Sequence, residues 1–195
     1  MQQERGRRTR AAVLEAATAL IAEVGWGRVS TRAVADRAGV RAGVVHYHFR
    51  SQQELLAEAA TGAIAAMVQE WLALLQGSDG PEQALHRGVG ALAELSPDHP
   101  MHLLFAETYL AASRDESVAE RLRGVLVELR GGLTRWLVEQ GVEPTTATTL
   151  APLLAAALDG LALHRGLDPG LPLGALPRLL GPVLAHADRE TGGAR

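Results

Sequence analysis

The segment from Ser30 to Phe49 reads STRAVADRAGVRAGVVHYHF and indicates the fold most clearly. Gly39 divides it into two short segments, and glycine adopts a positive φ at a turn without steric cost. Small apolar residues recur at three- and four-residue spacing, at Val34, Ala35, Ala38, Val40 and Val45. Two short helices with inward apolar faces and a glycine turn predict a helix-turn-helix, whose second helix enters the major groove of DNA.

Positive charge is concentrated in the same part of the chain. Residues 1–50 contain nine arginines and four acidic residues, a balance of +5, which leaves −8 for the rest of a chain with net charge −3. A basic segment attracts the phosphates of duplex DNA, and an acidic remainder opposes non-specific binding. A solvated basic helix without a ligand is the alternative interpretation of this pattern.

Apolar residues recur at helical spacing along the whole chain, and strand signals are nearly absent. We therefore expect an all-α fold of about nine helices. Glycines, prolines and capping residues place them near 8–24, 30–38, 41–47, 51–75, 81–95, 101–112, 113–140, 145–164 and 173–188. We expect Ser30, Ser51, Ser113 and either Thr145 or Thr146 to act as N-caps.

The loop at 77–81 separates segments of different composition, and we expect two domains. Residues 1–56 are predicted to form a three-helix, helix-turn-helix DNA-binding domain, and residues 57–195 a helical ligand-binding and dimerisation domain. The helix at 145–164 is apolar nearly all round, and the last helix adds a second apolar stripe. We expect these last two helices to form a homodimer interface, with burial inside one chain as the alternative.

The sequence argues against several other classes of protein. It has no cysteine, no secretory signal pattern and no uninterrupted apolar run near the roughly 20 residues of a membrane span. We therefore expect a cytoplasmic protein outside the membrane. Glycine-rich phosphate loops, Gly-x-Ser-x-Gly and His-Glu-x-x-His are absent, and the histidines match no compact metal motif. We expect no enzyme activity, no cofactor and no metal site.

A little over a quarter of the chain resembles the DNA-binding domain of the tetracycline-repressor (TetR) family. The resemblance rests on Ala35-Asp36-Arg37-Ala38-Gly39-Val40, Gly43, Val45-His46-Tyr47-His48-Phe49 and Ser51-Gln52-Gln53-Glu54-Leu55, in the family's order and spacing. Three positions depart from the pattern, because Gln52 replaces a phosphate-binding lysine, His46 a tyrosine and Arg50 a frequent proline. Arg50 is expected to replace the missing charge.

The resemblance implies that residues 41–47 enter the major groove, with base edges nearest Arg41, Ala42, Gly43 and His46 and phosphate near Tyr47. The chemistry agrees, because an arginine offers a bidentate fork to guanine and a tyrosine hydroxyl donates to phosphate oxygen. Further phosphate contacts are expected from Ser30, Thr31, Arg32 and Arg50. The arginines at 5, 7, 8 and 10 are expected to form an arm along the DNA.

Aromatic and polar residues interrupt the aliphatic helices of the second domain. This combination is typical of a small-molecule pocket, in which apolar walls hold the ligand and a few polar groups orient it. The candidates are Trp71, His102, Phe105, Tyr109, Trp136 and His164, with His86, Glu107, Thr108 and Asp159 in the same pattern. For each residue, an ordinary core or surface role is the alternative.

We therefore predict a sequence-specific, DNA-binding transcriptional regulator, a ligand-responsive repressor that binds a pseudo-palindromic operator as a homodimer. Its partners are double-stranded operator DNA, a second copy of the chain and an unidentified small-molecule effector. Two alternatives remain at this stage. One is a helical dimeric interaction protein that does not read DNA, and the other is a small helical enzyme.

Overall fold

The computed structural model describes residues 2–78, 81–94, 96 and 99–178, and none of these lies in a β-strand. The α-helices are α1 (Gln2–Val24), α2 (Thr31–Ala38), α3 (Ala42–His48), α4 (Gln52–Gln76), α5 (Pro81–Glu94), α6 (Pro100–Ala112), α7 (Glu116–Glu139) and α8 (Pro144–Leu167). Short 3-10 helices follow α1 and α8, at Trp26–Arg28 and Leu173–Ala175. The predicted all-α fold is confirmed. Most of the helix predicted at 173–188 lies outside the described residues.

The chain divides into two compact units, and neither is one continuous segment. The first contains residues 1–65 and 100–124, and the second contains residues 66–99 and 125–195. Helices α4 and α7 contribute residues to both units. The predicted DNA-binding segment 1–56 falls within the first unit, and its boundary at residue 56 stays a prediction.

In the first unit, α1 packs against α2, α3 and α6 and is tied to α4. The Thr18 hydroxyl donates to the Ala59 carbonyl at 3.1 Å, and Arg10 forms an ion pair with Glu58 at 2.5 Å. The buried side chains include Val13, Ala17, Ile21, Val34, Val45, Leu55, Leu56 and Ile64. Their three- and four-residue spacing on α1 and α4 is the reason that both helices face this core.

Helix α1 begins at Gln2, six residues before its predicted start at Arg8. Arg7 and Arg8 lie one turn after Glu4 and pair with it at 3.1 and 3.6 Å, which favours helix in this segment. The arginines predicted to form an arm therefore lie on a helix. Arg10 in addition packs over the buried Phe49 ring, 5.0 Å from its centroid, and serves the protein's own core.

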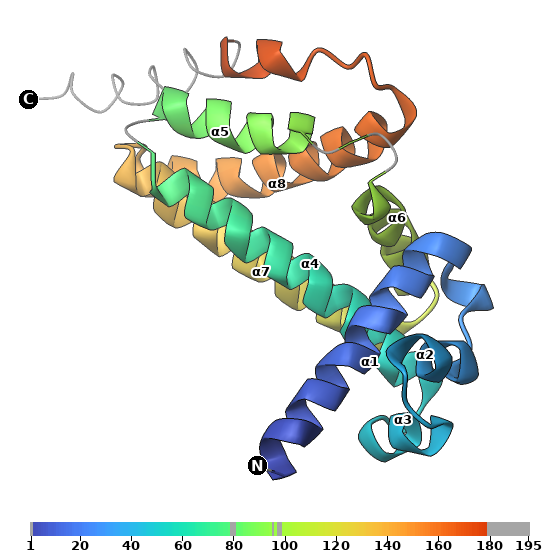
Figure 1. Cartoon of the computed structure of the whole chain (residues 1–195). Helices are drawn as coiled ribbons and strands as arrows, with labels where there is room; N and C mark the ends of the chain where they lie inside the picture. The colour runs from blue at the N-terminus through green and yellow to red at the C-terminus, as the bar shows by residue number, and fades with distance from the viewer. Residues whose placement is uncertain (1, 79–80, 95, 97–98, 179–195) are drawn as a thin grey trace, which may run out of the picture. The chain divides into compact units, whose positions relative to one another are not determined.

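In the second unit, the later halves of α4 and α7 lie side by side (Figure 1). A Cβ placed on Gly132 of α7 would lie 2.5 Å from a methyl group of Leu72 on α4. Only a residue without a side chain permits this close approach. Helix α5 joins them through Trp71, whose indole donates to the Gly88 carbonyl at 3.1 Å. Arg165 of α8 donates to the Ala93 carbonyl of α5 at 3.2 Å.

Helix α8 has an unusual composition for an exposed helix. By length and composition alone, it is apolar enough to cross a membrane, with a mean hydropathy of 1.4 in an 18-residue window that is 22% buried. The expectation concerned an uninterrupted apolar run, and α8 is not one, because threonines and Asp159 interrupt it. Its buried residues are alanines, at Ala147, Ala151, Ala155 and Ala162, so one narrow face packs inside the chain.

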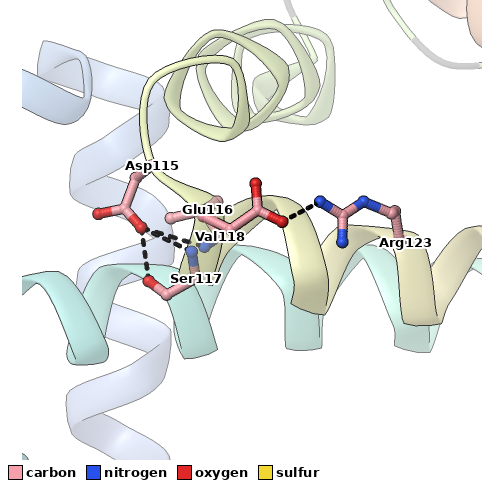
Figure 2. A network of polar contacts seen from close by, with 5 residues as sticks. All are labelled: Asp115, Glu116, Ser117, Val118 and Arg123. Carbon is pink, nitrogen blue, oxygen red and sulfur yellow. Dashed lines mark hydrogen bonds and ion pairs between the residues drawn. The ribbon is translucent and has the colours of Figure 1, made fainter.

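The structure confirms only some of the N-caps that the sequence predicts. Ser51 is confirmed, because its hydroxyl accepts from the Glu54 N–H at 3.0 Å. The predicted cap at Ser113 is wrong, because α7 begins at Glu116 and Asp115 accepts from the N–H groups of Ser117 at 2.8 Å and Val118 at 3.4 Å (Figure 2). The cap at Thr145 or Thr146 is also wrong, because Glu143 caps α8. In both cases a nearby carboxylate is the stronger acceptor.

We predict that Gly132→Ala destabilises the protein by about 1–3 kcal/mol, because the added methyl forces Leu72 out of its place. The control is Gly124→Ala on the same helix, where a Cβ meets nothing within 4 Å. That change is expected to stabilise by about 0.5–1 kcal/mol through helix propensity. Urea unfolding at a fixed protein concentration checks both. Equal effects of the two changes would contradict the packing argument.

The cap at Asp115 predicts a pH dependence. The Ser117 hydroxyl and backbone N–H hold the pKa of Asp115 below its ordinary value of 3.8. A lowered folded-state pKa contributes stability above the unfolded-state value, and this stability is lost as the pH falls through the folded-state value. Asp115→Asn is therefore expected to be less stable than the unmodified protein at pH 7, with a difference that shrinks below about pH 4. Unfolding midpoints at both pH values, with Glu120→Gln as an exposed control, test this; a constant difference refutes it.

Candidate nucleic-acid interface

The turn between α2 and α3 has the geometry that the sequence predicts. Gly39 adopts φ 66° and ψ 31°, the left-handed region that favours glycine. The N–H groups of Gly39 and Val40 donate back to the carbonyls of Asp36 at 3.3 Å and Ala35 at 3.0 Å. At the other end of α2, the Ser30 hydroxyl accepts from the Ala33 N–H at 3.1 Å, which confirms Ser30 as the N-cap. Both ends of α2 are therefore fixed by local hydrogen bonds.

Helix α3 has one buried and one exposed face. Val45 is buried on the inner side, where α2 contributes the buried Val34 and Ala35. The outer side contains the five residues predicted to read or approach DNA: Arg41, Ala42, Gly43, His46 and Tyr47, all exposed. The Tyr47 side chain is 85% exposed. An aromatic residue held this far out of the core is positioned for contact with another molecule.

The predicted phosphate-binding residues flank this face. Ser30, Arg32 and Arg50 are exposed, and Thr31 is half-buried at the first turn of α2. Arg32 lies 4.0 Å from Asp36, and Arg50 lies 3.8 Å from Glu54. Exposed pairs at such distances contribute little stability, so both guanidinium groups are available to phosphates at small cost.

Two polar residues in this region have structural roles that the sequence did not reveal. Gln52, at the family's lysine position, donates its amide N–H to the Val29 carbonyl at 2.8 Å. Arg37 forms a forked ion pair with Glu23 of α1, with N–O distances of 2.7 to 2.9 Å. Both contacts fix the helix-turn-helix to α4 and α1, and no local sequence pattern indicates either of them.

The turn before α2 is held from α6. The Glu107 carboxylate accepts from the Trp26 backbone N–H at 2.8 Å, although the two residues are 81 positions apart in the chain. A cavity of about 350 Å³ opens beside this contact, lined by Ile21, Ala22, Glu23, Val24, Gly25, Gly27, Arg28, Leu103 and Glu107. None of the six ligand candidates is among its lining residues.

The six ligand candidates are divided between the two units. His102, Phe105 and Tyr109 lie in the first unit on α6, where His102 and Phe105 are buried and Tyr109 is half-buried. The others lie in the second unit: half-buried Trp71, buried Trp136 and exposed His164. The Trp71 indole is already bound to Gly88, whereas the buried Trp136 indole has no acceptor among the described residues.

Comparison with known proteins shows which protein family has these features. Residues 13–59 match the model of bacterial regulatory proteins of the tetR family. A transcriptional regulator from Rhodococcus sp. Rha1 is 31% identical over 94% of this chain and 97% of that one, with a TM-score of 0.73. A regulator from Streptomyces coelicolor A3(2) is 30% identical over 93% of this chain and 98% of that one, with a TM-score of 0.68.

A curated relative, the HTH-type transcriptional regulator BetI of Agrobacterium fabrum, is 28% identical over 85% of this chain and 80% of its own length. An uncharacterised HTH-type transcriptional regulator of Mycobacterium tuberculosis is 25% identical over 86% of this chain and 88% of its own length. The likeness thus extends well beyond the helix-turn-helix. The chain belongs to the TetR family of bacterial regulatory proteins and is a DNA-binding transcriptional regulator.

Proposed function

We propose that the protein is a ligand-responsive repressor that binds a pseudo-palindromic operator as a homodimer. The observation that supports this most directly is the outer face of α3, where Arg41, Gly43, His46 and Tyr47 are exposed together beside a basic first helix. In a dimer, two such helices enter successive major grooves about one helical turn apart or more. An inverted repeat in the operator then matches the twofold symmetry of the protein.

The roles within this face follow from side-chain chemistry. Arg41 precedes α3 in an extended conformation, from which its guanidinium reaches the edge of a guanine with two hydrogen bonds. A Cβ on Gly43 would meet nothing within 4 Å in the protein, so a glycine there serves close approach to DNA. His46 and Ala42 complete the base-reading set, and Tyr47, Arg32 and Arg50 bind phosphates together with Ser30 and Thr31 at the start of α2.

The effector is proposed to be a small molecule with apolar surface and at least one hydrogen-bond acceptor. The Trp136 indole supports this class, because it is 2% exposed and its N–H lacks an acceptor among the described residues. A buried donor is costly to leave unpaired, and a ligand carbonyl or hydroxyl would satisfy it. The ligand releases DNA only as far as it prefers the conformation that binds operator poorly.

The homodimer is proposed to form through α8 and the helix that the sequence predicts at 173–188. Opposite its buried alanines, α8 presents Leu153, Ala156, Gly160, Leu163 and Leu167 at three- and four-residue spacing. Leu153 and Leu167 are 64% and 90% exposed, which is costly for leucines in water. The small residues between them allow the same face of a second copy to approach closely. This apolar face is the reason to propose a protein contact for α8. We also propose that the regulator acts in the cytoplasm and has no enzyme activity.

Operator recognition gives a direct test. Purified protein at a stated salt concentration is used to select sequences from random duplex DNA, and an inverted repeat is the expected result. Arg41→Ala with Tyr47→Ala is expected to lower affinity for that repeat at least tenfold, since a lost bidentate base contact costs about 1–3 kcal/mol.

Arg121→Ala, an exposed arginine on α7, is the matched control and is expected to leave operator affinity nearly unchanged. If the double variant binds the repeat as well as the unmodified protein does, the assignment of α3 as the recognition helix is refuted. If no sequence is enriched at all, the proposal of a pseudo-palindromic operator is refuted.

The α8 interface is tested by charge. Leu153→Glu together with Leu163→Glu is expected to convert the dimer to monomers, because two buried carboxylates would face their own copies. Val127→Glu on α7 is the matched control, since Val127 is 65% exposed and lies outside the proposed interface. Sedimentation equilibrium measures the mass of each variant. A dimer that survives both changes on α8 would exclude this face.

A further inference from the structure

The turn that joins α1 to α2 is fixed by a side chain from a distant part of the sequence. Glu107 of α6 accepts a hydrogen bond from the Trp26 backbone N–H at 2.8 Å. Gly25, the residue before Trp26, has φ 84°, and a Cβ on Gly25 would lie 3.3 Å from the Glu107 carboxylate. Glycine at position 25 therefore serves two purposes, because it permits the backbone conformation and leaves room for the carboxylate.

The Trp26 side chain adds a second set of contacts. Its indole N–H donates to the Gln53 side-chain oxygen of α4 at 3.5 Å, a long and weak hydrogen bond. The Gln53 amide in turn donates to Asp115 at 2.9 Å, and Asp115 is the cap of α7. The turn is thus tied to α6 through its backbone and to α4 and α7 through its ring, all within the first unit.

The charge of Glu107 and its hydrogen bond have opposite expected effects on DNA binding. This difference distinguishes a positioning role from a purely electrostatic one. By its charge alone, a carboxylate in the unit that contains the helix-turn-helix repels DNA and lowers affinity. Its hydrogen bond acts in the opposite direction, because the Trp26 turn determines where α2 starts relative to α1. Val34 and Ala35 of α2 and Val45 of α3 pack into one core, so a displaced α2 moves α3 with it.

We propose that Glu107 is a positioning residue for operator recognition, which holds the Trp26 turn so that α2 and α3 are set at the angle that specific DNA binding requires. This rests on the proposed binding of an operator by α3. Glu107 itself touches no DNA in this proposal. Its hydrogen bond contributes to specific affinity only, and removal of Glu107 should leave the affinity for unrelated DNA unchanged or slightly higher.

The test compares three single variants of the full-length protein. Glu107→Leu removes the acceptor, and Glu107→Gln keeps an oxygen acceptor of similar shape without the charge. Glu120→Leu removes the same charge from an exposed site on α7 in the same unit and is the matched control. Dissociation constants are measured for the operator selected by the unmodified protein and for an unrelated duplex of equal length, at one stated salt concentration. Thermal unfolding is followed in parallel.

Glu107→Leu is expected to weaken operator binding by roughly tenfold, the size of one lost hydrogen bond to a charged acceptor, with unrelated DNA bound as well as before or slightly better. Its ratio of specific to non-specific affinity therefore falls. Glu107→Gln is expected to restore that ratio to within about threefold of the unmodified protein, because an acceptor for the Trp26 N–H is present again. Glu120→Leu is expected to leave the ratio unchanged.

Two results would overturn the proposal. If Glu107→Leu lowers the unfolding temperature but keeps the affinity ratio, Glu107 supports stability only. If both affinities rise together in Glu107→Leu and Glu107→Gln, its charge is what matters. Should Glu107→Leu not fold, Glu107→Ala takes its place with the same expectations, and an unchanged ratio there refutes the proposal. Failure of the operator proposal itself is seen earlier, since the unmodified protein would then select no sequence.

Discussion

The direction in which the exposed face of α3 points depends on the angle at which the chain turns from α2 into α3, and that angle is set at Gly39. Its left-handed conformation allows two N–H groups to return to carbonyls of α2 and end the helix after Ala38. Only three residues separate the end of α2 from the start of α3 at Ala42. Because this connection is short and Val45 packs against α2, the opposite face of α3 is exposed to solvent.

The orientation of α2 and α3 also depends on the position of the segment before α2. Side chains from α4 and α6 hold that segment in place. Residues 25–30 lie between two helices, so several of their backbone groups have no helical partner. Gln52 donates to the Val29 carbonyl, and Glu107 accepts from the Trp26 N–H. These contacts replace missing backbone hydrogen bonds and at the same time attach the helix-turn-helix to α4 and α6. The same hydrogen bonds therefore pair polar backbone groups of the loop and orient the helix-turn-helix.

Small residues have a similar double use in the second unit. Gly132 lets α7 approach Leu72 of α4, and the alanines of α8 bury a narrow face that needs little space. The consequence for α8 is that its larger residues, such as Leu153 and Leu167, point outward. In the proposed dimer, the second copy covers this outer face, and the stability of the second unit then depends on association. The same distribution explains why composition alone would allow α8 to cross a membrane.

The features that arise within one or two helical turns could be predicted from the sequence. Helical spacing predicts α2, α3 and their buried face, and Gly39 predicts the turn, because backbone preference and the 3.6-residue period are local properties. Two of the predicted caps were wrong, because Asp115 and Glu143 take the place of the hydroxyl residues expected at those ends. Two hydrogen bonds could be found only in the folded chain: the bond between Glu107 and Trp26, across 81 residues, and the bond between Gln52 and Val29, across 23. Such pairs leave no periodic signal in a single sequence, because the partner of each side chain is a backbone group that any residue could supply.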